Sequence, residues 1–282
     1  MNYRHAFHAG NFGDVLKHAV LVRVIGHLCR KDAAFLVLDT HAGPGRYDLR
    51  SVPALKTAEF RAGIGRVAAA TDPPAPLAPY LELLARLNPE GLGAGIRFYP
   101  GSPELARRML RPQDRLVLNE LHPQDREALR HLMMGDRRVR VLGEDGYALV
   151  KAQLPPPERR GLILIDPPFE RPDDRERMIA ALRQGLRRFA TGTFLLWYPV
   201  KAADDGDRLF EMARAAVTAR LLQAELLVRA PGDPALLNGA GLLMVNPPWQ
   251  LASELSVLLP WLSETLRQGA GAGAKLRPTA DK

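Results

Sequence analysis

The chain has 282 residues, 46% of them hydrophobic, and its 39 Lys and Arg against 31 Asp and Glu give a formal net charge of +8. This composition excludes a wholly disordered chain, the single cysteine excludes an internal disulfide, and no apolar run approaches the roughly 18 residues that crossing a bilayer requires. The polar N-terminus lacks a signal-peptide core, so we expect a cytoplasmic protein, and the positive charge favours an anionic partner such as a nucleic acid without excluding an ordinary basic surface.

The N-terminal arm gathers aromatic, imidazole and cationic side chains ahead of a helix that we expect to begin near Asp14. Its sequence from residue 3 to residue 11 is Tyr-Arg-His-Ala-Phe-His-Ala-Gly-Asn. Histidines in and after the arm could in principle bind a metal ion, but their spacing matches no defined site, so we expect none. We interpret the arm as a segment that contacts a substrate or covers a cofactor.

The first predicted strand is the apolar run at residues 34–39, and a turn containing Gly43 and Gly45 follows its last residue, Asp39. Glycines at the carboxyl end of a strand allow a tight turn and a close approach of the backbone to a nucleotide-like ligand. The spacing does not match the three-glycine fingerprint of dinucleotide-binding folds. By itself this turn is therefore weak evidence for such a ligand.

A long segment separates this turn from the next predicted strand. It contains helical patterns at residues 57–70 and 79–87, with proline- and glycine-rich breaks at residues 72–76 and 89–93. We predict a small inserted helical subdomain over residues 51–97.

Acidic residues also follow the next two predicted strands, at residues 114–119 and 138–142. Glu120 comes directly after the first of them, and Asp145 follows the second. Glu120 could accept hydrogen bonds from both ribose hydroxyls of a cofactor, and Asp145 could accept one from its adenine amino group. Because carboxylates repel pyrophosphate and attract a sulfonium cation, this crevice favours S-adenosylmethionine.

The most informative segment is Asp166-Pro167-Pro168-Phe169, which begins at the last residue of a strand predicted at residues 161–166 whose other residues are all apolar. Proline fixes φ and lacks an N–H group, so the turn presents the Pro167 carbonyl beside the Asp166 carboxylate in a stiff frame. Two acceptors can hold both hydrogens of one amino group, and Phe169 could stack on a base removed from its helix. The segment predicts methylation of a planar amino group such as adenine N6.

Three further strands are predicted at residues 193–198, 221–228 and 242–246, with helices at residues 125–134, 173–189 and 208–219. Apolar strands that alternate with helices are typical of a mostly parallel sheet covered on both faces. We therefore predict an α/β, Rossmann-like fold with a seven-stranded sheet. The glycine-rich stretch from residue 269 contains little apolar material, so we expect residues 269–282 to be a disordered tail.

A second motif of this kind, Asn246-Pro247-Pro248-Trp249, also occurs in the chain. In a seven-stranded methyltransferase sheet the last strand runs antiparallel, and its end points away from the cofactor edge. We expect Asp166 to be catalytic and the segment from Asn246 to Trp249 to be a structural turn.

Taken together, these motifs resemble the bacterial 23S ribosomal RNA adenine-N6 methyltransferase family. The resemblance extends from Tyr3 to about Leu266 and is carried by Tyr-Arg-His-x-Phe-His-Ala-Gly-Asn, Leu-Lys-His, Asp-Thr-His-Ala-Gly-x-Gly-Arg-Tyr, Tyr-Pro-Gly-Ser-Pro, Glu-Leu-His-Pro, Asp-Gly and Arg-Arg-Gly-Leu-Ile-Leu-Ile-Asp-Pro-Pro. One departure is Phe169, where a tyrosine is usual; its ring can still stack on a base, but it has no hydroxyl.

The resemblance implies that residues 1–50 and 98–268 form a methyltransferase domain that acts on 23S rRNA with S-adenosylmethionine and no metal. Asp166 would accept the N6 proton and contact the cofactor, and the other implied cofactor contacts are His18, His41, Ser102, Glu120, Asp145 and Gly146. The resemblance also implies that Tyr3, His5 and Lys17 contact the substrate. Pro167 and Phe169, in the predicted pocket for the amino group, are expected to contact it as well. We expect a monomer, and we expect Lys17 to contact an RNA phosphate.

Two other functions fit the same residues. An amino-methyltransferase of this fold could act on DNA adenine or on a protein glutamine, because the acid-Pro-Pro-aromatic pocket suits any planar amino group. The absence of a separate DNA-reading domain disfavours DNA, and the positive charge disfavours a protein substrate. A non-catalytic RNA-binding protein could also retain the fold, but it would tolerate loss of Asp166.

Overall fold

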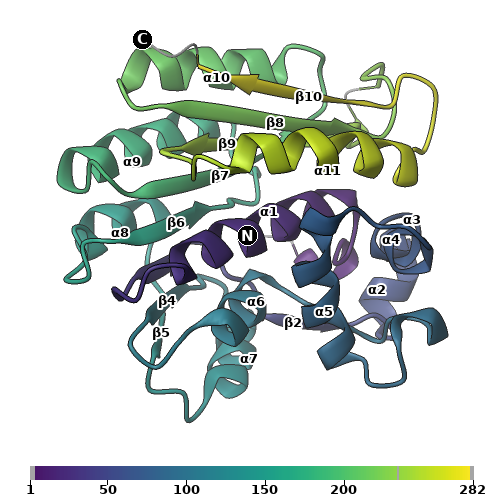
Figure 1. Ribbon diagram of the computed structural model, residues 1–282, viewed down its shortest axis with the longest axis horizontal. Helices are drawn as coiled ribbons and strands as arrows, with labels where there is room; N and C mark the ends of the chain where they lie inside the picture. The colour runs from purple at the N-terminus through teal and green to yellow at the C-terminus, as the bar shows by residue number, and fades with distance from the viewer. Residues whose placement is uncertain (1–3, 234, 280–282) are drawn as a thin grey trace.

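The protein is described here by a computed structural model that covers residues 4–233 and 235–279. An eight-stranded sheet with the order β10-β8-β9-β7-β6-β1-β4-β5 runs through its centre (Figure 1). Strands β1, β4, β5, β6 and β7 are parallel, β9 is antiparallel to both β7 and β8, and β10 is antiparallel to β8. The strands are β1 (Leu36–Asp39), β4 (Arg115–Asn119), β5 (Val139–Leu142), β6 (Gly161–Ile165), β7 (Thr193–Val200), β8 (Leu221–Leu227), β9 (Gly239–Val245) and β10 (Gly273–Pro278).

The predicted Rossmann-like α/β class is confirmed, and each of the seven predicted strands is present, but the expected strand number is wrong. The eighth strand, β10, lies in the segment expected to be disordered. It pairs with the edge of β8 through its backbone, and Lys275 and Arg277 bind the Asp207 carboxylate at 2.5 and 3.2 Å. Backbone pairing and ion pairs therefore order a segment that has few apolar side chains.

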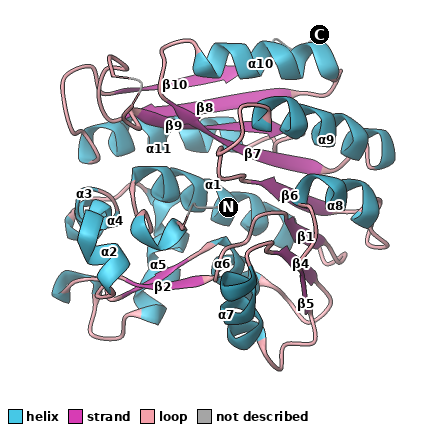
Figure 2. Ribbon diagram, turned by 180° about the vertical axis from the view of Figure 1, so that it is seen from behind, coloured by secondary structure: helices cyan, strands magenta, loops and turns pink. Residues whose placement is uncertain are grey.

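Helices cover both faces of the sheet. Figure 1 shows α1 (Phe12–Cys29) and α11 (Leu251–Thr265) on one face, and Figure 2 shows α8 (Gly146–Gln153), α9 (Asp174–Arg188) and α10 (Asp205–Ala216) on the other. Alternate residues of each strand enter two different cores: Val37 packs with the α1 side, whereas Leu36 and Leu38 pack with the α8–α10 side. This alternation follows from the two-residue period of a strand. Helices α6 (Ser102–Met109) and α7 (Pro123–Met133) flank β4.

The predicted insertion forms a group of short helices beside α1. These are α2 (Val52–Thr57), α3 (Glu59–Ala62), α4 (Ile64–Ala69) and α5 (Ala78–Leu87), and a pair of antiparallel strands, β2 (Arg46–Asp48) and β3 (Phe98–Pro100), closes the segment. The single helix expected over residues 57–70 is broken by a left-handed residue, Ala58, with φ of 52°, and again at Gly63. Ile64 and Tyr80 pack into the same core as α1.

The chain order of the strands determines where a ligand can bind. From β1 the sheet extends through β4 to β5 on one side, and through β6 to β7 on the other. Ligands of open α/β sheets bind at the carboxyl ends of the strands where this order reverses. Asp39, Glu120 and Asp166 stand at or directly after the ends of β1, β4 and β6, so the predicted site residues meet at this edge.

Candidate active site

A cavity of about 970 Å³ opens at the carboxyl edge of the sheet, beside the N-terminus of α1. This size lies at the upper end of the usual range for small-molecule sites. Its lining includes every described residue that was predicted for the site: His5, Lys17, His18, His41, Ser102, Glu120, Asp145, Gly146, Asp166, Pro167 and Phe169. Tyr3, the remaining predicted residue, lies outside the described residues.

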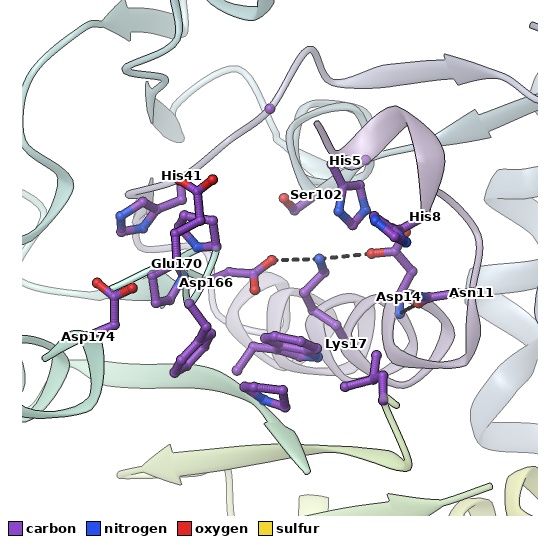
Figure 3. A pocket seen from close by; sticks show the side chains of 18 of the residues that line it. His5, His8, Asn11, Asp14, Lys17, His41, Ser102, Asp166, Glu170 and Asp174 are labelled. Atoms are coloured by element: carbon purple, nitrogen blue, oxygen red, sulfur yellow. Dashed lines mark hydrogen bonds and ion pairs between the residues drawn. The ribbon is translucent and has the colours of Figure 1, made fainter. Parts of the chain in front are cut away.

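The predicted catalytic carboxylate is paired with a lysine from α1. Lys17 Nζ lies 2.6 Å from Asp166 Oδ2 and 2.9 Å from Asp14 Oδ1, so one ammonium bridges two carboxylates (Figure 3). Within the described part of the chain, no residue donates a hydrogen bond to the other Asp166 oxygen, Oδ1. That oxygen and the neighbouring Pro167 carbonyl remain available as acceptors.

The groups of this bridge stay charged because their pairing outweighs the effect of burial. Burial by itself lowers the pKa of Lys17, but the two carboxylates outweigh it and hold that pKa above its ordinary value. Burial by itself raises the pKa of Asp14. The neighbouring His5 and Lys17 lower it by more, so the net pKa of Asp14 is well below its ordinary value. Lys17 is therefore a cation and Asp14 an anion at neutral pH.

This geometry argues against the phosphate contact that we expected for Lys17. Only 5% of the residue is exposed, and its ammonium is already bound by two carboxylates. A phosphate would have to enter between these two negative charges, which repel it. Lys17 orients Asp166 instead.

Asp14 was expected only to mark the start of a helix, yet it joins the arm to the Lys17–Asp166 pair. Its Oδ2 accepts a hydrogen bond from the Gly10 amide at 2.9 Å and lies 2.8 Å from His5 Nε2. The side chain of Asn11 caps α1 by accepting from the Asp14 amide at 3.0 Å. The Asp14-x-x-Lys17 spacing, which places both side chains on one helical face, was the sequence signal for this role.

Two histidines in the cavity wall, the buried His18 and the half-buried His41, are neutral. Burial lowers the pKa of His18 to about 3 and that of His41 to about 4. His18 Nδ1 lies 2.8 Å from the Tyr99 hydroxyl, while its Nε2 is buried with no hydrogen-bond partner among the described residues. Neutral rings do not repel a cationic ligand, and the unpartnered Nε2 can bind a ligand atom.

The end of β1 carries an acid with an unusual pKa. Burial raises the pKa of Asp39 to about 7, although the Ser102 hydroxyl and the His41 amide hydrogen-bond to it. Ser102 Oγ donates to Asp39 Oδ2 at 2.7 Å and also lines the cavity. Sequence reasoning placed Ser102 in the site but did not pair it with Asp39, because 63 residues separate them.

Glu120 binds the glycine turn that follows β1. Its Oε2 accepts from the Gly43 amide and its Oε1 from the His122 amide, each at 2.7 Å. Gly43 has φ of 63°, and a Cβ there would lie 2.7 Å from the Tyr47 hydroxyl, so the turn requires glycine. Burial raises the pKa of Glu120.

Asp145 was predicted to accept a hydrogen bond from the adenine amino group of the cofactor, and both of its carboxylate oxygens already have partners within the protein. Its Oδ1 caps α8 by accepting from the Tyr147 and Ala148 amides at 3.0 Å, and its Oδ2 binds Arg177 at 2.6 Å. A cofactor amino group would have to share Oδ2 with this arginine. The adjoining Gly146 allows α8 to approach β1, because a Cβ there would lie 2.5 Å from the Thr40 carbonyl oxygen.

The aromatic side of the cavity is formed by Phe169 and by Trp197 of β7, which sequence reasoning missed. Their ring centroids are 5.9 Å apart with a tilt of 60°. Phe169 has φ of 51°, a left-handed conformation that costs on the order of 1 kcal/mol for such a side chain. The sequence feature that could have indicated Trp197 is its place in the predicted strand that became β7.

The second Pro-Pro motif lies at the opposite edge of the sheet. The Asn246 side chain donates to the carbonyls of Ala190 and Gly192 at 2.8 and 2.9 Å, at the start of β7. Strand β9 runs antiparallel to β7, as expected for the strand that precedes this motif. The segment closes a turn, and Trp249 is exposed rather than part of the cavity.

Two negative findings hold for the described residues only. None of their helices has the length and apolar character needed to cross a membrane. No group of three or more His, Cys, Asp or Glu side chains among them is arranged to hold a metal ion.

The chain is similar in sequence and in structure to known proteins. A family model described as "Ribosomal RNA large subunit methyltransferase D, RlmJ" matches residues 32–277. The chain is 43% identical over 273 residues to ribosomal RNA large subunit methyltransferase J of Haemophilus influenzae, and the match covers 96% of each chain. It is 44% identical over 266 residues to the protein of that name in Escherichia coli K12, with 94% of each chain covered. A crystal structure of a Legionella pneumophila protein superposes with a TM-score of 0.86 at 34% identity, covering 96% of this chain and 97% of that one.

Proposed function

Because the chain belongs to the RlmJ family of large-subunit ribosomal RNA methyltransferases, we propose that it methylates the N6 amino group of one adenine in 23S rRNA with S-adenosylmethionine. The observation that carries the chemistry is the pair of acceptors, Asp166 Oδ1 and the Pro167 carbonyl, at the edge of a cavity large enough for a cofactor and a base. Neither a DNA nor a protein substrate is favoured by the family.

The residues of the cavity suit S-adenosylmethionine, which supplies a methyl group on a positively charged sulfur when bound. Glu120 and Asp145 present carboxylates, whereas His18 and His41 are neutral, so the wall attracts a cation. Glu120 would hold the ribose hydroxyls, and Ser102 would lie on the same side. We propose that the α8 N-terminus, at Gly146, faces the adenine of the cofactor.

Asp166 and Pro167 would act on the target amino group. The lone pair of adenine N6 is delocalised into the ring, so the free amino group is a poor nucleophile. Hydrogen bonds from its two N–H groups to Asp166 Oδ1 and to the Pro167 carbonyl favour a pyramidal nitrogen with a localised lone pair. Lys17 occupies Asp166 Oδ2 and fixes the direction of the carboxylate. Since Lys17 stays protonated, the leaving proton passes to Asp166 and not to the lysine.

The substrate adenine has to leave its helix to reach this pocket, because Asp166 is partly buried. Phe169 and Trp197 offer aromatic surface for the base, and His5, within the N-terminal arm, also lines the cavity. The substrate implies that the protein works in the cytoplasm, where ribosomal RNA is found in bacteria.

Two measurements test this function. Mass spectrometry of 23S rRNA from cells with and without the gene should show loss of one N6-methyladenine. In vitro, the Asp166→Ala variant should bind RNA like the wild type but transfer methyl groups roughly 100-fold more slowly, the size expected for loss of one positioned proton acceptor. Unchanged turnover would refute the role of Asp166, and no methyl transfer by the wild type would favour a non-catalytic RNA-binding protein.

A further inference from the structure

The short helices of residues 51–97 contact residues 5–11 of the N-terminal arm at several points next to the site. The Ile64 amide donates to the Gly10 carbonyl at 2.8 Å, and the Thr57 hydroxyl donates to the Phe7 carbonyl. Gly63 packs directly on the arm, because a Cβ there would lie only 2.1 Å from the Gly10 oxygen. This approach requires glycine and places α3 and α4 against the arm.

Glu59, the first residue of α3, makes the polar part of this contact. Its Oε1 lies 2.8 Å from His8 Nδ1, and its Oε2 accepts from Asn11 Nδ2 at 3.0 Å. The hydrogen bond to Glu59 raises the pKa of His8. Glu59 borders the cavity, but both of its oxygens are engaged by the arm, so it acts on the site through these two residues.

The arm in turn holds the catalytic pair. Asn11 caps α1, and Gly10 donates to Asp14, which binds the ammonium of Lys17. A continuous set of contacts therefore leads from Glu59 through the arm and Asp14 to Lys17 and Asp166. Figure 3 shows His8, Asn11 and Asp14 together on one side of Lys17, with Asp166 on the other.

We propose that Glu59 is a positioning residue for methyl transfer, through which the inserted helices hold residues 5–11 so that Lys17 stays aligned with Asp166. This inference rests on the proposed function of the site. A small displacement of an aligned group can slow a reaction by up to about 100-fold, and the two contacts of Glu59 supply part of that alignment. We expect the Glu59→Ala variant to react roughly tenfold more slowly than the wild type.

The experiment measures single-turnover methyl transfer to 23S rRNA at saturating cofactor and RNA, together with the two dissociation constants. Hydrogen exchange of the amides of residues 5–11 is followed in the same proteins. For Glu59→Ala we expect a roughly tenfold lower rate, dissociation constants within about twofold of wild type, and faster exchange in the arm but not in β6. Glu82→Ala is the matched control, since Glu82 lies exposed on α5 and should behave as wild type.

Glu59→Gln provides a second variant if the alanine variant folds poorly. Its amide oxygen can still accept from Asn11 while the charge facing His8 is lost, so we expect an intermediate rate and partial rescue. Wild-type rates for both variants would overturn the proposal, and so would a lower rate without faster exchange in the arm. A wild-type protein that methylates no RNA would refute the proposed function instead, and the exchange measurement would still report whether Glu59 orders the arm.

Discussion

Asp39 gives the sharpest quantitative test of the electrostatics in this site. Burial raises its pKa from 3.8 to about 7, and the hydrogen bonds from Ser102 and His41 offset this only in part. Between these two pH values the folded protein binds more protons at Asp39 than the unfolded chain does. Linkage then requires that this group's contribution to the free energy of unfolding falls as the pH rises through that window. The full change corresponds to about 4 kcal/mol.

The two neutral histidines of the cavity wall, His18 and His41, act with the opposite sign. His18 and His41 have folded pKa values of about 3 and about 4, below the ordinary 6.5, so the unfolded chain binds more protons than the folded one and stability rises with pH up to about 6.5. The wild-type profile therefore mixes opposing slopes. Comparing the wild type with a variant changed only at Asp39 removes the contribution of His18, whereas His41, whose amide hydrogen-bonds to Asp39, is coupled to it.

Asp39→Asn is the appropriate substitution because an amide imitates the protonated acid. Its oxygen can accept from the His41 amide, and its NH₂ can donate to the Ser102 hydroxyl. Urea unfolding from pH 4 to pH 8 should show the variant gaining stability relative to wild type by about 4 kcal/mol across the range. A difference that stays constant within about 1 kcal/mol would refute the buried, high-pKa carboxyl.

Three other substitutions test separate parts of the structure. Lys17→Met should destabilise the protein by about 3–5 kcal/mol in denaturant unfolding at pH 7, because it leaves the buried Asp14 and the partly buried Asp166 without their cation. The same variant should slow methyl transfer while leaving the salt dependence of RNA binding unchanged. Asn246→Ala should cost about 1–2 kcal/mol in the same unfolding assay by removing two hydrogen bonds, yet retain wild-type methyl transfer; loss of turnover would assign chemistry to the second Pro-Pro motif. Gly63→Ala should lower stability by about 1–3 kcal/mol, since its Cβ would meet the Gly10 carbonyl, whereas Gly93→Ala, with open space around it, should be nearly neutral in thermal unfolding.

How far the sequence predicts this structure depends on what orders each segment. The apolar runs that became β1, β6 and β9 carry their own signal, because burial on both faces demands continuous hydrophobic residues. Strand β10 carries almost none, since its order comes from pairing with β8 and from ion pairs to α10. The interruption of the predicted helix at Gly63 could not be inferred from the sequence either, because it comes with a backbone contact to Gly10, 53 positions earlier in the chain.

In the candidate site, too, some features follow from the local sequence and others depend on contacts between distant residues. Acids at the ends of parallel strands could be grouped from strand order alone, and Glu120 and Asp166 indeed line one cavity. Contacts between a helix and a distant turn could not be inferred in this way. The Lys17–Asp166 pair joins residues 149 positions apart, and it changes the interpretation of Lys17 from a phosphate contact to a group that orients the acceptor.

Because Lys17 is paired with two carboxylates, the phosphates of a nucleic acid must bind elsewhere. A wall with several carboxylates repels phosphate, whereas an extruded adenine is neutral, so the base can enter while its backbone stays at the rim. Lys201, at the end of β7, is exposed and borders both the main cavity and a smaller pocket of about 280 Å³ beside Phe169. We therefore expect Lys201→Ala, and not Lys17→Met, to reduce the slope of log affinity against log salt by about 0.7–1, as loss of one phosphate contact should. Equal slopes for Lys201→Ala and wild type would place the phosphate contacts elsewhere on the rim.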